Sequence, residues 1–302
     1  MKKLFDITVP ASTANVGPGF DSIGIALGRF LNIEVYEHDS FSCEAYGDYL
    51  RGIPTDESNL IFQTAFDVAK QYHKDLPACH LKLKSNIPLT RGLGSSASAI
   101  VGGILLANEL CHLNLGLDDQ LSIATSMEGH MDNVGASIYG GLVIGTYIDE
   151  KAYIQHSTIN NVSVIAIIPT YELETKHARN ILPKEIPHRD AILSSSFSNL
   201  LVAALLSENW KLAGDMMKRD LFHEPYRSKI VKELEILKTH KLPQYVYGHV
   251  LSGAGPTILA FVDKEYCQNA KEFFENLFPN YEISEITVEN TGAKVEHSIH
   301  VK

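Results

Sequence analysis

The segment from residue 88 to residue 98 carries the residue types best suited to chemistry in this chain. It reads Pro88, Leu89, Thr90, Arg91, Gly92, Leu93, Gly94, Ser95, Ser96, Ala97 and Ser98. Glycines let the backbone turn tightly and approach a ligand closely, so that successive N–H groups can point into one concavity. A helix expected to begin just after Gly94 adds the positive end of its dipole. The segment therefore suits nucleotide phosphates, and the hydroxyls of Ser95 and Ser96 can bind phosphate oxygens or Mg²⁺.

The glycine pattern of this segment differs from two common phosphate-binding patterns. A P-loop needs Gly-Lys followed by Ser or Thr, and that tripeptide does not occur in the chain. A dinucleotide-binding fingerprint has the form G-x-G-x-x-G, whereas Gly94 is followed by two serines and an alanine. A glycine-containing turn capped by serine is the simpler alternative, so phosphate binding needs support from elsewhere in the chain.

Two further segments, residues 10–21 and 252–257, have a similar character. The first is dense in turn formers and small polar residues, and the second reads Ser-Gly-Ala-Gly-Pro-Thr between two apolar runs. Taken alone, the first fits a surface loop and the second fits a hairpin turn. Together with residues 88–98, they strengthen the case for a nucleotide site.

The elements that must position these segments are predicted from hydrophobic periodicity. Alternation of apolar and polar residues predicts strands over residues 31–36 and 80–84, the latter just before the glycine-rich segment. Apolar residues between 62 and 69 recur at helical spacing behind Ser58, which is the expected N-cap. The small, apolar stretch 95–111 indicates a buried helix.

A second set of elements follows in the C-terminal half. The expected strands cover residues 162–168, 245–251, 257–262 and 281–288, and the expected helices lie around residues 197–205, 230–237 and 270–277. Because strands and helices mix without strict alternation, the pattern favours an α+β protein over a doubly wound sheet. The gap between the two sets predicts a domain over residues 1–158 and another over residues 159–302.

The composition is that of an ordinary globular protein. The chain has 302 residues, of which 45% are hydrophobic, and a formal net charge of −10. No basic block stands out, which argues against a nucleic-acid partner, and no apolar run reaches the length of a membrane span. Asp6 lies where a signal peptide needs an apolar core, and the four cysteines form no C-x-x-C pair. We therefore expect a cytoplasmic protein with free thiols.

The three small-residue segments, in their order and at their separations, resemble the signature motifs of the GHMP kinases. That superfamily is named after galactokinase, homoserine kinase, mevalonate kinase and phosphomevalonate kinase. The resemblance runs from about residue 8 to residue 262, and residues 88–98 are its most specific part. Within the superfamily, the first motif is similar to that of the homoserine kinases, as are residues 128–134, 175–179 and 223–227.

The resemblance implies a fold and an activity. The N-terminal half is expected to resemble domain 2 of ribosomal protein S5, with a left-handed βαβ unit, and the C-terminal half to be ferredoxin-like. The implied reaction is the ATP-dependent phosphorylation of L-homoserine in threonine biosynthesis, with Mg²⁺ as cofactor. Many members are homodimers, so a homodimer is also expected.

The resemblance also implies roles for individual residues. Residues 88–98 wrap the ATP triphosphate, and Ser96 and Glu128 are the candidates for binding Mg²⁺, because a hydroxyl and a carboxylate supply the hard oxygen ligands that the ion prefers. Arg179 and Arg227 fall where the family binds the substrate carboxylate, for which a guanidinium fork is well shaped. The remaining substrate contacts are expected from Asp21 to the ammonium, from Thr175 near the reacting hydroxyl, and from Asn15, His130, Asn133 and the backbone of Gly253.

The general base is left open by the sequence. Mevalonate-type relatives use an aspartate in the loop after the Mg²⁺ carboxylate, with help from an N-terminal lysine. Asp132 lies in the corresponding loop and is the candidate base, but the chain has no lysine just before its first motif. The alternative is that the proton passes to the γ-phosphate or to water.

Two other functions fit the same scaffold. Another GHMP-type kinase, for mevalonate-pathway or sugar substrates, would not need two arginines directed at a carboxylate. A ligand sensor that has lost catalysis would be expected to lack a serine of the phosphate loop or the Mg²⁺ carboxylate. Because Ser95, Ser96 and Glu128 are all present, an active kinase is the favoured interpretation.

Overall fold

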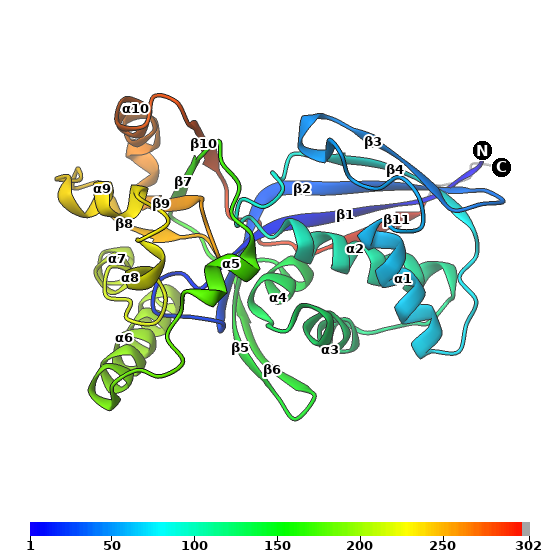
Figure 1. Ribbon diagram of the computed structural model, residues 1–302, viewed down its shortest axis with the longest axis horizontal. Helices are drawn as coiled ribbons and strands as arrows, with labels where there is room; N and C mark the ends of the chain where they lie inside the picture. Colours follow the sequence, from blue (N-terminus) through cyan, green and yellow to red (C-terminus); the bar gives the residue numbers. More distant parts are fainter. Residues whose placement is uncertain (298–302) are drawn as a thin grey trace.

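The N-terminal half of the molecule is a mixed sheet with helices packed on one face, as the computed structural model of residues 1–297 shows (Figure 1). The seven strands are β1 (Lys3–Ala14), β2 (Ile23–Glu37), β3 (Ser42–Tyr46), β4 (Cys79–Ser85), β5 (Leu142–Ile148), β6 (Lys151–Ser157) and β11 (Lys294–His297). The helices are α1 (Leu60–Gln71), α2 (Ser95–Leu110), α3 (Leu117–Glu128) and α4 (Asp132–Tyr139). Strands β3 and β4 are parallel and are joined through α1, which gives the expected βαβ unit.

The central strand β2 shows why the alternating pattern was informative. Leu31 and Ile33 are buried, whereas Asn32 between them is exposed. Successive side chains of a strand point to opposite faces, so one face of β2 joins the core under the helices. The strand predicted over residues 31–36 is confirmed, and it is one part of a longer strand.

The start of α1 corrects the predicted N-cap. Asn59, not Ser58, caps the helix, and its side-chain oxygen accepts a hydrogen bond from the N–H of Ile61 at 3.0 Å. The hydroxyl of Ser58 instead donates to Asp56 Oδ1 at 2.5 Å, in the turn before the helix. Asn and Ser are comparable as N-caps, so the helical spacing alone did not separate two adjacent candidates.

The C-terminal half contains a four-stranded antiparallel sheet with the order β10-β7-β9-β8. Its strands are β7 (Ser163–Ile168), β8 (Val246–Leu251), β9 (Ile258–Val262) and β10 (Glu282–Ile286). Its helices are α5 (Thr175–Asn180), α6 (His188–Leu206), α7 (Trp210–Met217), α8 (Glu224–Arg227), α9 (Glu233–Thr239) and α10 (Cys267–Leu277). Apart from the extra helices between β7 and β8, this is the βαββαβ arrangement of a ferredoxin-like unit, so the expected α+β fold is confirmed.

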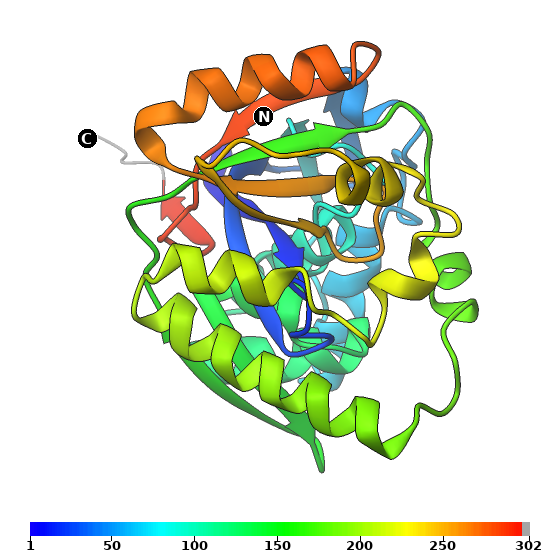
Figure 2. The ribbon, with the colours of Figure 1, turned by 90° about the vertical axis from the view of Figure 1, so that its left-hand side faces the viewer.

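Strand β7 is buried on both faces, which explains its continuous apolar sequence. Val164 and Ala166 pack into the core shared with α6, α7 and the N-terminal half. Ile165 and Ile167 point the other way and join the core under α9 and α10. Figure 2 shows α10 on one side of this sheet, with α6 and α7 on the other.

The chain passes from the first sheet to the second between β6 and β7, and the domain boundary placed there stays a prediction. Strand β6 ends at Ser157 in the first sheet and β7 begins at Ser163 in the second, on either side of the boundary expected at residues 158 and 159. Strand β11, however, returns to the first sheet and pairs with β1 (Figure 1). Residues 298–302, the end of the second expected domain, lie outside the described part of the chain.

A buried arginine joins the two halves near the site. Arg29 on β2 donates to the carbonyl oxygen of Asn86 at 2.9 Å and to Ser284 Oγ on β10 at 2.8 Å, and it also forms an ion pair with Glu282. Tyr49 donates to the same carboxylate of Glu282 at 2.6 Å. These polar contacts tie the second sheet to the first.

All four cysteines are free and buried, as expected for thiols that form no disulfide. Among residues 1–297, no helix combines the length and the apolar character that crossing a membrane requires.

Candidate active site

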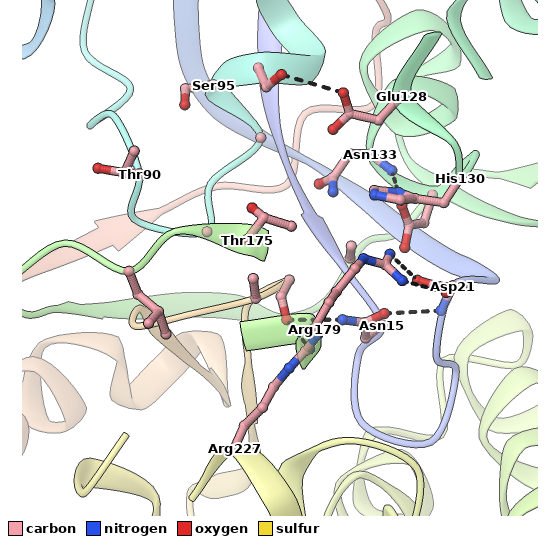
Figure 3. Close-up of a pocket in the computed structure, with 18 residues that line it drawn as sticks. Asn15, Asp21, Thr90, Ser95, Glu128, His130, Asn133, Thr175, Arg179 and Arg227 are labelled. Carbon is pink, nitrogen blue, oxygen red and sulfur yellow. Dashed lines mark hydrogen bonds and ion pairs between the residues drawn. The ribbon is translucent and has the colours of Figure 1, made fainter. Parts of the chain in front are cut away.

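A polar pocket of about 130 Å³ lies where the three motifs meet (Figure 3). Most of the residues proposed from the sequence line it: Asn15, Asp21, Thr90, Gly92, Gly94, Ser95, Ser96, Glu128, His130, Asp132, Asn133, Thr175, Arg179, Arg227 and Gly253. They come from both halves of the chain, since Arg179 lies on α5 and Arg227 on α8. The pocket is therefore formed by the packing of the two halves against each other.

The glycine-rich segment can adopt its path only because two positions lack a side chain. Gly92 and Gly94 have φ angles of +77° and +71°, which side chains disfavour. A Cβ atom would lie 2.3 Å from the carbonyl oxygen of Ser252 at the first position and 2.2 Å from Ser12 Oγ at the second. The loop is thus pressed between the first and third motifs, and Ser252 Oγ donates to the carbonyl oxygen of Gly92 at 2.6 Å.

Helix α2 begins at this loop and points its N-terminus toward the pocket. Gly94 is its N-cap, in the left-handed conformation, and Ser95 and Ser96 are its first two residues. The helix is 16 residues long and largely buried, as predicted. Its free N–H groups and its dipole both favour an anion at this end.

Ser96 and Glu128 face each other across the opening of the pocket. Ser96 Oγ donates to Glu128 Oε2 at 3.3 Å (Figure 3). Burial raises the pKa of Glu128, although the positive charge of His130 and the hydrogen bond from Ser96 act against this. Among residues 1–297, no lysine or arginine forms an ion pair with Glu128. A half-buried carboxylate beside a hydroxyl, without a cationic partner, is a suitable oxygen site for a divalent cation.

His130 and Asp132 form a close pair next to these oxygens. His130 Nδ1 lies 2.7 Å from Asp132 Oδ1, and the same oxygen accepts from the N–H of Asn133 at 2.7 Å. Burial acts to lower the pKa of His130, but the hydrogen bond and charge of Asp132 outweigh it, so the pKa is raised. His130 is therefore suited to donate a hydrogen bond into the pocket.

Asp21 and Arg179 form a second pair, with both carboxylate oxygens engaged. Arg179 donates from Nη2 to Asp21 Oδ1 at 2.8 Å and from Nη1 to Oδ2 at 3.1 Å. Asn15 supports this arrangement, because its Oδ1 accepts from the N–H of Asp21 at 3.0 Å and its Nδ2 donates to the carbonyl oxygen of Gly253 at 2.9 Å. Asp21, His130 and Asp132 also bring potential metal-ligating atoms within 4.8 Å of one another. However, His130 and Asp132 already contact each other, and Asp21 is already paired with Arg179.

Arg227 differs from Arg179, because it forms no ion pair with an acidic residue in the described part of the chain. It is only 1% exposed, yet it lines the pocket. Its guanidinium donates to the carbonyl oxygen of Gly253 at 2.9 Å, to that of Ala178 at 3.2 Å and to His223 Nδ1 at 3.1 Å. Among residues 1–297, no carboxylate forms an ion pair with it. Burial lowers the pKa of Arg227 to about 10, and the charge of Arg179 adds to this.

Some residues of the glycine-rich segment do not reach the pocket. Pro88, Leu93, Ala97 and Ser98 are buried in the packing around the loop. The guanidinium of Arg91 turns away to bond the carbonyl oxygens of Pro169 and Thr170 at 3.1 and 2.8 Å, and it pairs with Glu172. Its side chain therefore ties the loop to the C-terminal half, and a phosphate contact remains a prediction only for its backbone.

The remaining predicted residues occupy the rim and wall of the pocket. Asn133 accepts a hydrogen bond from Ser12 Oγ at 3.0 Å, which fixes its side-chain amide. Thr175 is exposed at the start of α5. Gly253 presents its carbonyl oxygen to both Asn15 and Arg227.

His223 was not assigned a role from the sequence, although it belongs to the segment 223–227. It is fully buried, with Nε2 3.1 Å from the carbonyl oxygen of Gly17 and Nδ1 3.1 Å from Arg227 Nη1. Because arginine can only donate, Nδ1 must accept and Nε2 must carry the proton. Burial lowers the pKa of His223 to about 4, so it stays neutral in this role. The signal in the sequence was its position one helical turn before Arg227.

An apolar cavity of about 250 Å³ lies next to the glycine-rich segment 88–98, and sequence reasoning did not identify it. It shares Thr90, Ser95 and Ser96 with the polar pocket. Its remaining wall is mostly aliphatic: Leu31, Leu50, Ile53, Pro54, Leu60, Ile61, Leu83, Ile87 and Leu89. The start of α2 is therefore the partition between a charged compartment and an apolar one.

Comparisons with known proteins agree with this architecture. The GHMP kinase N-terminal domain model matches residues 59–141, and the GHMP kinase C-terminal model matches residues 201–280. A homoserine kinase from Bacillus pumilus is 47% identical over 294 residues, covering 97% of this chain and 95% of the relative. A homoserine kinase from Staphylococcus aureus is 46% identical over 269 residues, covering 88% of each chain.

Solved structures extend the comparison to the fold. The homoserine kinase from Cytophaga hutchinsonii superposes with a TM-score of 0.84 at 29% identity, covering 98% of each chain. The mevalonate diphosphate decarboxylase from Staphylococcus aureus, at 16% identity and a TM-score of 0.68, shares the fold. The polar pocket between two such domains is thus found in a chain that belongs to the GHMP kinase superfamily and, within it, to the homoserine kinase family.

Proposed function

We propose that this chain transfers the γ-phosphate of ATP to the hydroxyl of L-homoserine, forming O-phospho-L-homoserine in threonine biosynthesis. The observation that supports this most directly is the state of Arg227. A buried guanidinium that lines the pocket is satisfied only by neutral acceptors and has no acidic partner among residues 1–297. Burying a charge without a counter-charge is costly, so the missing partner is expected to come from the ligand.

The carboxylate of an amino acid is the partner that fits this gap. A carboxylate accepts charge-assisted hydrogen bonds from guanidinium groups, often two at a time. Arg227 and Arg179 lie close enough for the charge of Arg179 to lower the pKa of Arg227, so one anionic group can bind both. This supports a substrate that carries a carboxylate next to the reacting alcohol.

The pair between Asp21 and Arg179 supports a zwitterionic substrate. A ligand with both an ammonium and a carboxylate can take the place of each partner, with its ammonium on Asp21 and its carboxylate on Arg179. A ligand with only one of these charges would leave the other partner unsatisfied, and buried polar groups without partners are penalised. An amino acid is therefore favoured over mevalonate or a sugar, and Asn15 keeps Asp21 in place for this contact.

The two compartments beside the phosphate loop suit the two ends of ATP. The triphosphate would lie over residues 88–98, at the N–H groups and dipole of α2. The adenine would occupy the apolar cavity, where aliphatic side chains such as Leu50 and Ile61 can pack against its faces. The shared wall at Thr90, Ser95 and Ser96 joins the two compartments, as one extended ligand requires.

Ser96 and Glu128 are the residues that would hold Mg²⁺. Their oxygens already approach each other at 3.3 Å, and Glu128 has no cationic partner in the described chain. When bound, the ion neutralises charge on the phosphates and helps to align them for transfer. The chain supplies the alignment of the alcohol, since phosphoryl transfer depends on position and charge more than on covalent help.

In the reaction, the substrate hydroxyl oxygen forms a bond to the γ-phosphorus while the bond to the β–γ bridging oxygen breaks and ADP leaves. Thr175 and Asn133 would orient the hydroxyl, and His130 would donate to an anionic oxygen. Asp132 is the candidate acceptor for the hydroxyl proton. Its Oδ1 is occupied by His130 and Asn133, whereas its Oδ2 forms no hydrogen bond within residues 1–297.

A substrate panel tests this function. ADP release with ATP and Mg²⁺ would be followed for L-homoserine, mevalonate, galactose and 4-hydroxybutanoate, and the product identified by its ³¹P resonance. We expect L-homoserine to have by far the highest kcat/KM. A preference for mevalonate or a sugar would identify another kinase of the superfamily. ATP binding without ADP release on any alcohol would indicate a sensor.

The cellular setting is a separate part of the proposal. Four free, buried thiols fit a reducing compartment, which supports a cytoplasmic location. A homodimer is implied by the family resemblance alone. Light scattering at micromolar concentration would measure the mass in solution, with a value near 33.4 kDa indicating a monomer.

A further inference from the structure

Phe20 lies beneath both arginines of the pocket but had no role assigned to it. Its ring centroid is 5.8 Å from Arg179 Cζ and 5.6 Å from Arg227 Cζ, and both guanidinium groups lie over the ring. These distances are within the range of cation–π attraction. Phe20 also directly precedes Asp21, so one short segment contacts Arg179 through its carboxylate and both arginines through its aromatic face.

The two guanidinium groups lie close enough to repel each other. They are like charges that share one aromatic ring, and the pKa of Arg227 is lowered by burial and by the charge of Arg179. Asp21 forms its ion pair with Arg179, and the charges of Asp21 and Asp220 offset only part of the effect of burial on Arg227. The face of an aromatic ring supplies further negative potential next to both guanidinium groups.

The ring itself is held by its neighbours. His223 stacks on Phe20 with a centroid distance of 5.2 Å and an interplanar angle of 22°, and Phe222 stacks at 6.4 Å and 26°. His223 also bonds to Arg227 and to the carbonyl oxygen of Gly17. The ring, the imidazole and the guanidinium therefore form one packed unit, in which the position of Phe20 affects that of Arg227.

We propose that Phe20 is a positioning residue for carboxylate recognition: its π face lies under Arg179 and Arg227 and holds the two like charges in one place for the substrate. The proposal rests on the function given above for the two arginines. It predicts that the aromatic face, and not the volume of the side chain, sets the affinity for L-homoserine. Phe20 acts through the arginines and does not line the pocket.

Substitutions at this one position separate the aromatic face from its volume. Phe20→Leu keeps much of the apolar volume without a π face, and we expect the KM for L-homoserine to rise roughly 5- to 30-fold. The kcat and the KM for ATP should change less than about twofold, because Phe20 lines neither the polar pocket nor the apolar cavity. Phe20→Tyr keeps the ring and should restore the KM to near its original value.

Replacement of Phe20 by 3,4,5-trifluorophenylalanine tests the charge of the ring face at nearly constant shape. Fluorination removes the negative potential of the face, so the KM for L-homoserine should rise as in Phe20→Leu. An unchanged KM in the trifluoro protein would overturn the proposal, since it would mean that packing alone accounts for the leucine variant. Equal increases in the KM values for ATP and L-homoserine would overturn it as well.

The matched control is a cation–π pair away from the pocket. Arg219 lies over Phe197 with a Cζ–centroid distance of 5.6 Å. Phe197→Leu makes the same substitution on α6 and should leave the KM for L-homoserine unchanged. If Phe197→Leu raised the KM for L-homoserine as much as Phe20→Leu does, the increase would reflect a general loss of packing. That result would count against the proposal.

A readout without substrate separates this proposal from the proposed function. In ligand-free protein, ring currents from Phe20 should displace the Nε–H resonances of Arg179 and Arg227, assigned with lysine substitutions at each position. Phe20→Leu should move both resonances toward random-coil values, whatever alcohol the enzyme uses. If the protein did not phosphorylate L-homoserine but the two resonances were displaced, only the proposed function would be contradicted. If the resonances were not displaced, the role of Phe20 would be contradicted.

Discussion

Asp21 and Arg179 form a two-point ion pair across the pocket, although 158 residues separate them in the sequence. Each was expected to bind the opposite end of an amino acid. In the structure they bind each other, so we expect a zwitterionic substrate to take the place of both partners. Because both groups are only part-buried, exchange with a zwitterion costs little in charge compensation. This relationship explains how a charged pocket can remain stable before substrate arrives.

Removal of Asp21 should change which substrates are accepted. Asp21→Asn keeps the size of the side chain but loses the counter-charge for an ammonium. We expect the KM for L-homoserine to rise roughly 10- to 100-fold, by loss of one charge-assisted contact. The KM for 4-hydroxybutanoate, which lacks the ammonium, should not rise, because Arg179 becomes free for its carboxylate. Steady-state kinetics on both alcohols measure the ratio of the two KM values. A ratio equal to that of the wild type would contradict the role of Asp21.

Removal of Arg227 should weaken substrate binding more than any other single change in the pocket. Arg227→Ala takes away the buried cation that lacks an acidic partner, and we expect the KM for L-homoserine to rise roughly 30- to 1,000-fold. ATP affinity, measured by calorimetry, should barely change. Arg219→Ala, on an arginine away from the pocket, is the control. Unaltered homoserine kinetics in Arg227→Ala would remove the main physical support for an amino-acid substrate.

From the sequence it was easier to predict which residues line the pocket than which of them contact each other. Glycine is required at positions 92 and 94 for local reasons, because only glycine tolerates their positive φ angles and the close contacts around them. Whether Arg227 has a partner depends on which segments pack around it, and no local pattern carries that information. Arg91 shows the same limit, because its side chain turned to carbonyl groups of the C-terminal half.

In the fold, too, features set by the local sequence were predicted and features set by distant segments were not. Strands with alternating or continuous apolar residues, such as β2 and β7, were predicted because periodicity reports burial directly. The return of β11 to the first sheet had no such signal, since edge pairing of a four-residue strand depends on the partner strand β1. The apolar cavity beside α2 was missed for the same reason, as its wall comes from several distant segments.

The role of Glu128 as a metal ligand can be tested by its response to Mg²⁺. Glu128→Gln keeps one oxygen but loses the negative charge, so the ion should bind more weakly. We expect activity at limiting Mg²⁺ to fall by about tenfold or more, and excess Mg²⁺ to restore part of it. Glu272→Gln, on the exposed surface of α10, should titrate with Mg²⁺ like the wild type. A Glu128→Gln enzyme with no response to metal concentration would exclude this carboxylate from the site.

The proton acceptor is tested by a change that keeps the local hydrogen bonds. In Asp132→Asn, the side-chain oxygen can still accept from His130 and from the N–H of Asn133. If Asp132 takes the hydroxyl proton, kcat should fall about 100-fold or more, while both KM values change little. We expect this larger loss. A decrease in kcat below about tenfold would instead mean that the proton passes to the γ-phosphate or to water.

Glu224 gives the protein a stability that should depend on pH in a defined window. This carboxyl group is buried one helical turn before Arg227, and its Oε1 accepts from the N–H of Leu251 at 2.7 Å. Burial raises its pKa to about 8, from an ordinary value of 4.5. Between these two values the unfolded chain loses the proton while the folded chain keeps it. The free energy of unfolding should therefore decrease as pH rises through the window, by up to ~1.4 kcal/mol per pH unit.

Glu224→Gln should remove this dependence, because glutamine can still accept from Leu251 and has no proton to lose. Urea denaturation at pH values from 5 to 9 would compare the two proteins. The variant should gain stability relative to the wild type as pH rises toward 8, and the difference should level off above that value. Glu272→Gln, which replaces an exposed carboxylate, should follow the wild-type curve. Parallel curves for Glu224→Gln and the wild type would show that Glu224 is ionised in the folded protein, because only a proton retained on folding produces the divergence.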